Sequence, residues 1–200
     1  MTYPIVNPIA IDFGIIKIHW YGLMYLFSFL IGYALAHRRI HQKRFPLSKE
    51  KLADFLGWIA LGVIFGGRIG YMLFYQPGAL IENPLSIFFI WKGGMAFHGG
   101  LIGVTLFTWY FAKKNSINPL ALGDALAPLI PIGLGLGRLG NFIGGELWGR
   151  PTDLPWGIVF PSGGEVARHP SQLYECALEG LVLFCLMWWF SAKPRKPGQV

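Results

Sequence analysis

Five long apolar segments constrain the fold of this 200-residue chain more than any other feature. A membrane-spanning helix needs about 20 mostly apolar residues. We place such spans at about 16–36, 52–75, 91–112, 121–145 and 171–192. Charged residues make up only 14% of the chain, against about a quarter in soluble domains. The sequence therefore predicts an all-α, polytopic membrane protein of about five transmembrane helices, with residues 1–200 in one integral membrane domain.

The Lys and Arg residues set the predicted orientation. Eleven of the 17 fall in the first and third connections or in the tail, which the spans place on one side of the membrane. Because cytoplasmic loops are enriched in Lys and Arg, we expect the N-terminus outside and the C-terminus in the cytoplasm. The polar, Pro- and Gly-rich stretch at about 147–170 is then external. The basic loops face anionic headgroups, and no separate basic patch predicts nucleic-acid binding.

The two cysteines, Cys176 and Cys185, are expected to be free. Nine residues of helix would separate them by about 13 Å, too far for a disulfide. No Cys/His spacing predicts a metal site, and no cofactor is expected. The N-terminus lacks the basic region and cleavage pattern of a signal peptide, so the first apolar segment is expected to remain as a span.

Glycines four residues apart predict close helix packing inside the spans, because small residues let helices approach closely in lipid. These glycines are Gly62, Gly66 and Gly70, then Gly133 and Gly137, and Gly140 and Gly144. The string GRIG at 67–70 recurs as GRLG at 137–140. An internal duplication and a coincidence between two Gly-rich spans both remain open.

Ionisable groups inside spans are costly, and each is by default a hypothesis of function. Those in or at the edges of spans are Arg68, His98, Asp124, Arg138, Glu146, Glu175 and Glu179. Three of the acids, Asp124, Glu175 and Glu179, lie near span ends, and we interpret them as reaching water. Arg68 is either functional or a structural partner for a buried acid such as Glu146.

Three polar residues favour a functional interpretation. His98 sits in GGMAFHGG, where flanking glycines expose the backbone. Arg138 and Asn141 are three residues apart and share one helix face. Counted along the spans at about 1.5 Å per residue, His98, Arg138 and Arg68 lie about 10 Å from the outer ends. Tyr21 lies at a similar level. These depths predict a polar cavity that opens toward the outer leaflet.

Such a cavity suits an anionic lipid. An arginine offers phosphate a planar fork of donors with a permanent charge, and a histidine can take up a proton near neutral pH. From the residues alone, chemistry on a phospholipid and carriage of an anionic solute both remain open.

Five motifs carry a family resemblance. The segment GRLGNFIGGELWGR at 137–150 resembles the signature of the prolipoprotein diacylglyceryl transferases. HWYGLMYL at 19–26, GGRIGYMLFY at 66–75, GGMAFHGGLIG at 93–103 and RHPSQLYE at 168–175 are similar to the same family in the same order. The resemblance covers nearly the whole chain. It implies a transferase of the bacterial inner membrane, with its active site toward the outer leaflet.

The family resemblance also implies a reaction. The diacylglyceryl group of phosphatidylglycerol passes to the thiol of the lipobox cysteine of a prolipoprotein, which forms a thioether and releases glycerol phosphate. Carried over by position, His98 is the candidate base or orienting group, and Tyr21 and Arg138 share the catalytic role. The implied phosphatidylglycerol-binding residues are Arg138, Asn141, Glu146, Gly99, Gly149 and Arg68.

The chain departs from the family pattern at two places. Gly144 stands where the signature usually has Asn, which removes one donor. Family members usually have seven helices, the last two with an arginine in a Glu-Phe-Phe-Arg-like segment that has no match here. We interpret the chain as a member shortened at its C-terminus. The alternatives are a transporter, a lipid-binding remnant without transferase activity, and a different membrane lipid transferase.

Overall fold

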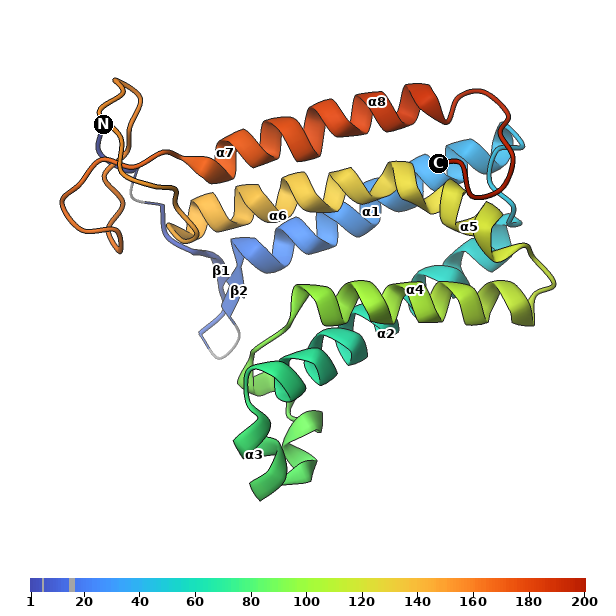
Figure 1. Cartoon of the computed structure of the whole chain (residues 1–200), viewed down its shortest axis with the longest axis horizontal. Coiled ribbons are helices and arrows are strands. Elements are labelled where there is room, and N and C mark those ends of the chain that lie inside the picture. Colours follow the sequence, from blue (N-terminus) through green and yellow to red (C-terminus); the bar gives the residue numbers. More distant parts are fainter. Residues whose placement is uncertain (5, 15–16) are drawn as a thin grey trace. The chain divides into compact units, whose positions relative to one another are not determined.

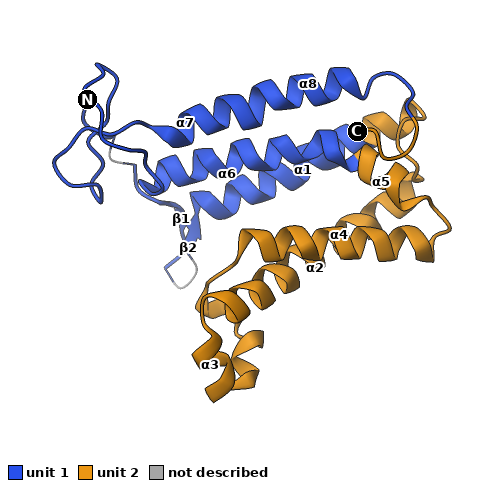
Figure 2. Ribbon diagram, viewed as in Figure 1, with its two compact units in different colours: residues 1–36, 126–195, 200 blue, residues 37–125, 196–199 orange. Residues whose placement is uncertain are grey.

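The computed structural model describes residues 1–4, 6–14 and 17–200. Helices dominate it (Figure 1), which confirms the predicted all-α class. The chain divides into two compact units (Figure 2). The first unit contains residues 1–36, 126–195 and 200, and the second contains residues 37–125 and 196–199.

The first unit begins with a small β-hairpin. Strands β1 (Ile9–Asp12) and β2 (Lys17–His19) pair antiparallel, and β2 leads directly into α1 (Trp20–His41), whose last residues belong to the second unit. The predicted start of the first span, Ile16, lies outside the described residues. The helix itself begins four residues later, because the preceding residues are paired in the hairpin.

The fourth apolar segment forms three consecutive helical elements: α5 (Pro119–Leu126), η3 (Ala127–Leu129) and α6 (Ile130–Gly144). The 3₁₀ turn η3 holds Pro128, and Pro131 follows at the start of α6. Proline has no N–H to donate to the preceding turn, which accounts for the local irregularity. The helix ends at Gly144 and is capped by Gly145, whose left-handed conformation (φ 66°) is typical of a glycine C-cap.

The last apolar segment contains a π-helical stretch. It runs through α7 (Ser171–Glu175), η4 (Cys176–Val182) and α8 (Leu183–Phe190), of which η4 is the π-helix. A Cβ added to Gly135 on α6 would lie 2.8 Å from the Cα of Gly180 in η4, so these two elements touch through their backbones. Both cysteines of this segment are free, as predicted.

The second unit is built on α2 (Lys49–Phe74) and α4 (Phe97–Lys114). The Ser48 side chain accepts a hydrogen bond from the Lys51 N–H at 3.4 Å, and so caps the start of α2. Between the two helices lie the short elements α3 (Pro77–Glu82), η1 (Pro84–Phe88) and η2 (Ile90–Lys92).

Glycines bring α2 and α4 into backbone contact. A Cβ on Gly66 would lie 2.3 Å from the Gly99 carbonyl oxygen, and one on Gly70 would lie 2.8 Å from the Gly99 Cα. The predicted role of the first glycine series is therefore confirmed. The prediction is wrong for Gly133 and Gly137, because a Cβ at either position would meet nothing within 4 Å among the residues that the structure describes.

Three helical segments of the described chain are long and apolar enough to cross a membrane: Lys49–Phe74, Pro119–Gly144 and Ser171–Phe190. The helices α1 and α4 have 22 and 18 residues, and we still expect both to span. The third predicted span started at residue 91, but α4 begins at Phe97. Gly93 and Gly94, with φ of 75° and 83°, interrupt the helix before it.

The polar segment 147–170 has no regular helix, as predicted, but it has a core. Tyr3, Ile158 and Phe160 are buried together, and Phe142 from α6 packs against them. The Tyr3 hydroxyl donates to the Phe142 carbonyl oxygen at 2.6 Å. Burial raises the pKa of Tyr3 above its ordinary value. This cluster joins the N-terminus and the segment 147–170 to the end of α6.

Candidate functional site

The last two turns of α6 carry Arg138 and Asn141, three residues apart as the predicted shared face requires. Asn141 is buried, whereas 33% of the Arg138 side chain is exposed. The helix is capped by Gly145, and the Glu146 N–H then donates to the Asn141 carbonyl oxygen at 3.1 Å. The glycine cap therefore returns the chain, and with it an acidic residue, to the polar face of α6.

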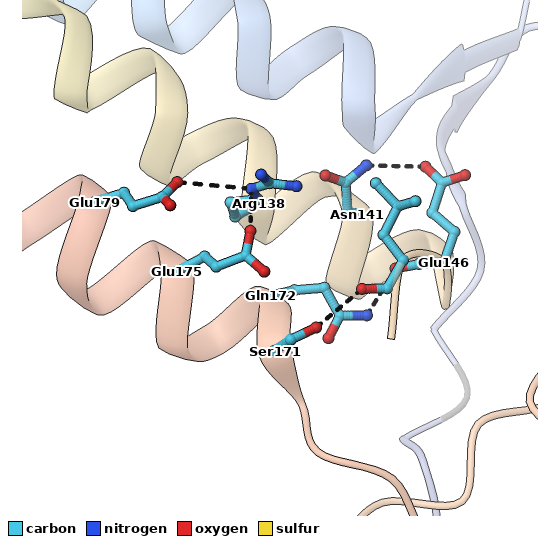
Figure 3. A network of polar contacts seen from close by, with 8 residues as sticks. Arg138, Asn141, Glu146, Ser171, Gln172, Glu175 and Glu179 are labelled. Carbon is cyan, nitrogen blue, oxygen red and sulfur yellow. Dashed lines mark hydrogen bonds and ion pairs between the residues drawn. The ribbon is translucent and has the colours of Figure 1, made fainter. Parts of the chain in front are cut away.

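Two carboxylates hold Arg138 from the neighbouring helical segment. The Nε atom lies 2.6 Å from Oε2 of Glu175, at the end of α7, and 4.0 Å from Oε2 of Glu179, in η4. Figure 3 shows that the two terminal amino groups of the guanidinium point away from Glu175. The sequence interpretation that these acids simply reach water missed both ion pairs.

A second set of contacts fixes the turn after α6 (Figure 3). Asn141 Nδ2 donates to Glu146 Oε1 at 3.1 Å. From the start of α7, Gln172 Nε2 donates to the Glu146 carbonyl oxygen at 2.6 Å, and Ser171 Oγ donates to the carbonyl oxygen of Leu147 at 3.0 Å. Leu147 has a φ of 57°, which side-chain-bearing residues rarely adopt. These hydrogen bonds help to hold the strained turn.

Tyr21 lies in the first turn of α1, beside α6. A Cβ added to Gly140 would lie 3.0 Å from a ring carbon of Tyr21, so the glycine allows the ring to approach. The Tyr21 hydroxyl lies 3.3 Å from that of Tyr25, and Gly140 stands between Arg138 and Asn141 on α6. The structure therefore brings together four of the predicted site residues, namely Tyr21, Arg138, Asn141 and Glu146.

Gly149 lies in the segment 147–170, where its backbone is bonded to the residues before α7. Its N–H donates to the His169 carbonyl oxygen at 2.9 Å, and a Cβ would lie 2.9 Å from the same oxygen. The His169 Nδ1 atom lies 3.2 Å from the Tyr174 hydroxyl, which also accepts from Trp156 Nε1 at 2.7 Å. The glycine is therefore required by a close backbone approach within the protein.

The second unit holds the remaining predicted residues. His98 is the second residue of α4, is exposed, and contacts the ring of Phe97 at a centroid distance of 5.5 Å. Within the described chain its ring nitrogens have no hydrogen-bond partner. Because α4 begins at Phe97, His98 lies in the first helical turn rather than seven residues inside a helix. Gly99 serves the α2–α4 contact described above.

Arg68, also in the second unit, is buried with 4% of its surface exposed. Its nitrogens donate to four main-chain carbonyl oxygens, those of Ser86, Ile87, Gly93 and Gly94. The Ser86 and Ile87 contacts measure 2.8 and 3.3 Å. The structure thus gives this guanidinium backbone partners rather than the carboxylate partner that the sequence suggested. It fixes the loop that leads into α4.

Sequence reasoning missed Gln172 and gave no role in the site to Glu175 or Glu179. The available signal was the motif RHPSQLYE, which holds Gln172 and Glu175, but nothing in it says which helix faces α6. Within residues 1–4, 6–14 and 17–200, no cluster of three His, Cys, Asp or Glu could hold a metal ion.

Comparison with known proteins agrees with the motifs. Residues 8–200 match the family model described as prolipoprotein diacylglyceryl transferase. The whole chain is 54% identical to a phosphatidylglycerol–prolipoprotein diacylglyceryl transferase of Bordetella parapertussis and covers 77% of its length. It is 52% identical to proteins of the same name from Legionella pneumophila and Pseudomonas aeruginosa, covering 78% and 75% of their lengths. This bacterial membrane protein therefore belongs to the prolipoprotein diacylglyceryl transferase family.

Proposed function

We propose that this protein transfers the diacylglyceryl group of phosphatidylglycerol to the lipobox cysteine of a prolipoprotein. The names of its relatives supply the lipid and the acceptor protein. The observation that carries the proposal is the way Arg138 is held: its Nε faces a carboxylate, and its two terminal amino groups point elsewhere. A guanidinium oriented in this way suits a phosphate group.

The reaction needs a thiolate and a stabilised leaving group. The cysteine sulfur attacks the carbon of the diacylated glycerol that bears the phosphate, and a C–S bond forms. The C–O bond to the phosphate breaks, its electron pair leaves on oxygen, and glycerol phosphate is released. Negative charge grows on the phosphate during this step, so a preorganised guanidinium accelerates it. An ordinary thiol has a pKa near 8.5, so a base that accepts its proton also helps.

The predicted residues divide between these tasks. Arg138 binds the phosphate, and Asn141, Glu146 and Tyr21 form the polar wall beside it. His98 is the candidate proton acceptor, since its exposed ring makes no hydrogen bond to the described chain. Loss of transfer in His98→Gln, with lipid binding retained, supports this assignment, and full activity of that variant excludes it.

The three other predicted residues act through the backbone. Arg68 fixes the loop before α4, Gly99 permits the α2–α4 contact, and Gly149 permits the contact with His169. In this proposal their contacts stabilise the fold and they do not touch the lipid, in place of the direct contact that the resemblance implies.

The site faces the outer leaflet, with the N-terminus outside and the C-terminus in the cytoplasm. The distribution of Lys and Arg supports this orientation. An external site is also the place where an exported prolipoprotein and the outer-leaflet lipid meet.

The test is a lipidation assay in detergent. The purified chain is mixed with phosphatidylglycerol and a lipobox peptide, and the peptide mass is followed. Gain of one diacylglyceryl group supports the proposal if it disappears with a Cys→Ser peptide and with the Arg138→Ala enzyme. An unmodified peptide, in the presence of folded protein and measurable lipid binding, refutes it.

A further inference from the structure

The ion pair between Glu175 and Arg138 is the shortest polar contact made by the site arginine. Glu175 Oε2 lies 2.6 Å from the guanidinium Nε, and the two side chains are 31% and 33% exposed. The carboxylate is therefore partly shielded from water on the helix beside α6. Opposite charges this close, and partly shielded from water, attract each other more strongly than a fully exposed pair does.

The nitrogen that Glu175 contacts matters more than the distance. An arginine presents three nitrogens in one plane, with Nε on the inner side and the two terminal amino groups at the end. A carboxylate at Nε leaves the end of the fork to a second partner. In Figure 3 both terminal amino groups point away from Glu175 and away from α7.

The backbone makes this contact possible. Gly135 and Gly180 bring α6 and η4 within backbone contact, so that a short acidic side chain reaches across. Glu175 is the last residue before the π-helical stretch. Such stretches are rare and occur frequently at functional sites. Further along the same segment, Glu179 lies 4.0 Å from Nε, too far for a hydrogen bond.

We propose that Glu175 is a positioning residue, which holds Arg138 by Nε so that the two terminal amino groups are presented to the phosphate of a phospholipid. This inference rests on the proposed function, and it names the group that prepares the phosphate site. Without Glu175 the guanidinium rotates among several orientations, and lipid binding then has to restrict it. The affinity for phosphatidylglycerol falls, while the chemistry of bound lipid changes little.

The experiment compares Glu175→Gln with Glu165→Gln. Glu165 is an exposed acid in the segment 147–170, so this control loses the same charge away from Arg138. Binding of phosphatidylglycerol to detergent-solubilised protein is measured by native mass spectrometry, and KM and kcat are measured separately. We expect Glu175→Gln to raise KM and the dissociation constant about tenfold, with kcat within about threefold of the parent. We expect Glu165→Gln to change neither, and Glu179→Gln to have a smaller effect than Glu175→Gln.

An Arg138→Lys background separates positioning from general support of the fold. Lysine has neither a nitrogen at the Nε position nor a fork of terminal amino groups to orient, so Glu175→Gln should weaken lipid binding no further in that background. An equal loss in both backgrounds overturns the inference, and so does unchanged binding in the single variant. If Glu175→Gln does not fold, Glu175→Asp replaces it. That shorter acid keeps the charge, and unchanged lipid binding by it overturns the inference.

The two readouts distinguish this inference from the proposed function. If the parent binds phosphatidylglycerol without transferring it, the transferase proposal fails, and the binding comparison still decides the role of Glu175. If the parent does not bind the lipid, the inference is overturned as well.

Discussion

The two arginines that follow a glycine in the strings GRIG and GRLG have opposite environments. Arg68 is 4% exposed, and main-chain carbonyl oxygens occupy its nitrogens. Arg138 has a side chain that is 33% exposed, with carboxylates at one edge of its guanidinium. The same four-residue pattern therefore provides an arginine that stabilises a loop in one unit and a candidate anion site in the other. What decides between them is the chain that surrounds each arginine. Arg68 makes four hydrogen bonds to backbone carbonyl oxygens, so only one of its five N–H donors is left for a ligand.

Among the variants that test this comparison, removal of Arg138 is expected to have the largest effect, a loss of transfer activity. Arg138→Ala should lower the transfer rate about 10²–10³-fold, because one stabilising donor group for the leaving phosphate is lost. The midpoint of thermal unfolding should stay within a few degrees of the parent. Mass spectrometry of the lipobox peptide and a thermal melt in detergent measure the two quantities. If the variant melts far below the parent, Arg138 is also needed for the stability of the fold, as Arg68 is.

Removal of Arg68 should have the reverse profile. Arg68→Ala leaves several buried carbonyl oxygens without donors and opens a cavity, which we expect to cost about 3 kcal/mol of unfolding free energy. Transfer activity should fall only as the folded fraction falls. Activity per folded molecule, obtained from the melt and the assay together, tests this. A stable Arg68→Ala protein with no activity would instead place Arg68 in direct contact with the lipid.

One glycine from each string sharpens the comparison further. Gly70 ends GRIG, and a Cβ there would lie 2.8 Å from the Gly99 Cα, where backbone cannot easily move. We expect Gly70→Ala to cost about 1–3 kcal/mol through overpacking of α2 against α4. The thermal unfolding midpoint provides the measurement. An unchanged midpoint would show that the two helices separate without loss.

The smallest effect is expected at Gly137, which begins GRLG. A Cβ there would meet no atom of the described chain within 4 Å, and alanine favours a helix over glycine by up to about 1 kcal/mol. Gly137→Ala should therefore raise the unfolding midpoint slightly. A lower midpoint would indicate that the added methyl group does clash with another part of the protein.

The sequence predicted the helices well because long apolar runs and their glycines follow directly from the lipid environment. The prediction was weaker where a local conformation interrupts a run. The left-handed glycines Gly93 and Gly94 move the start of α4 to Phe97, although Trp91 and Met95 continue the apolar character of the segment. Hydropathy averages over such positions and does not register a change of backbone angle.

The candidate site was predicted in part, for a comparable reason. Arg138 and Asn141 share a helix, so their spacing alone places them on one face. Glu175 and Gln172 reach the same place from another helix, and only tertiary structure says which residues of α7 face α6. The sequence also gave Arg68 and Arg138 similar weight, because burial and partner type cannot be read from a shared motif.

The π-helical stretch Cys176–Val182 separates the polar start of one helical segment, with the ion pair of Glu175, from its apolar end. A π turn contains more residues than an α turn, so it acts as an insertion that has kept the helix continuous. Deleting one residue from it would rotate everything beyond by about 100°. The ion pair at Glu175 precedes the stretch and would keep its register, while Trp189 and Phe190 would face a new direction. A change of length within the π-helical stretch therefore reorients the apolar end of this helix and leaves the polar end in place.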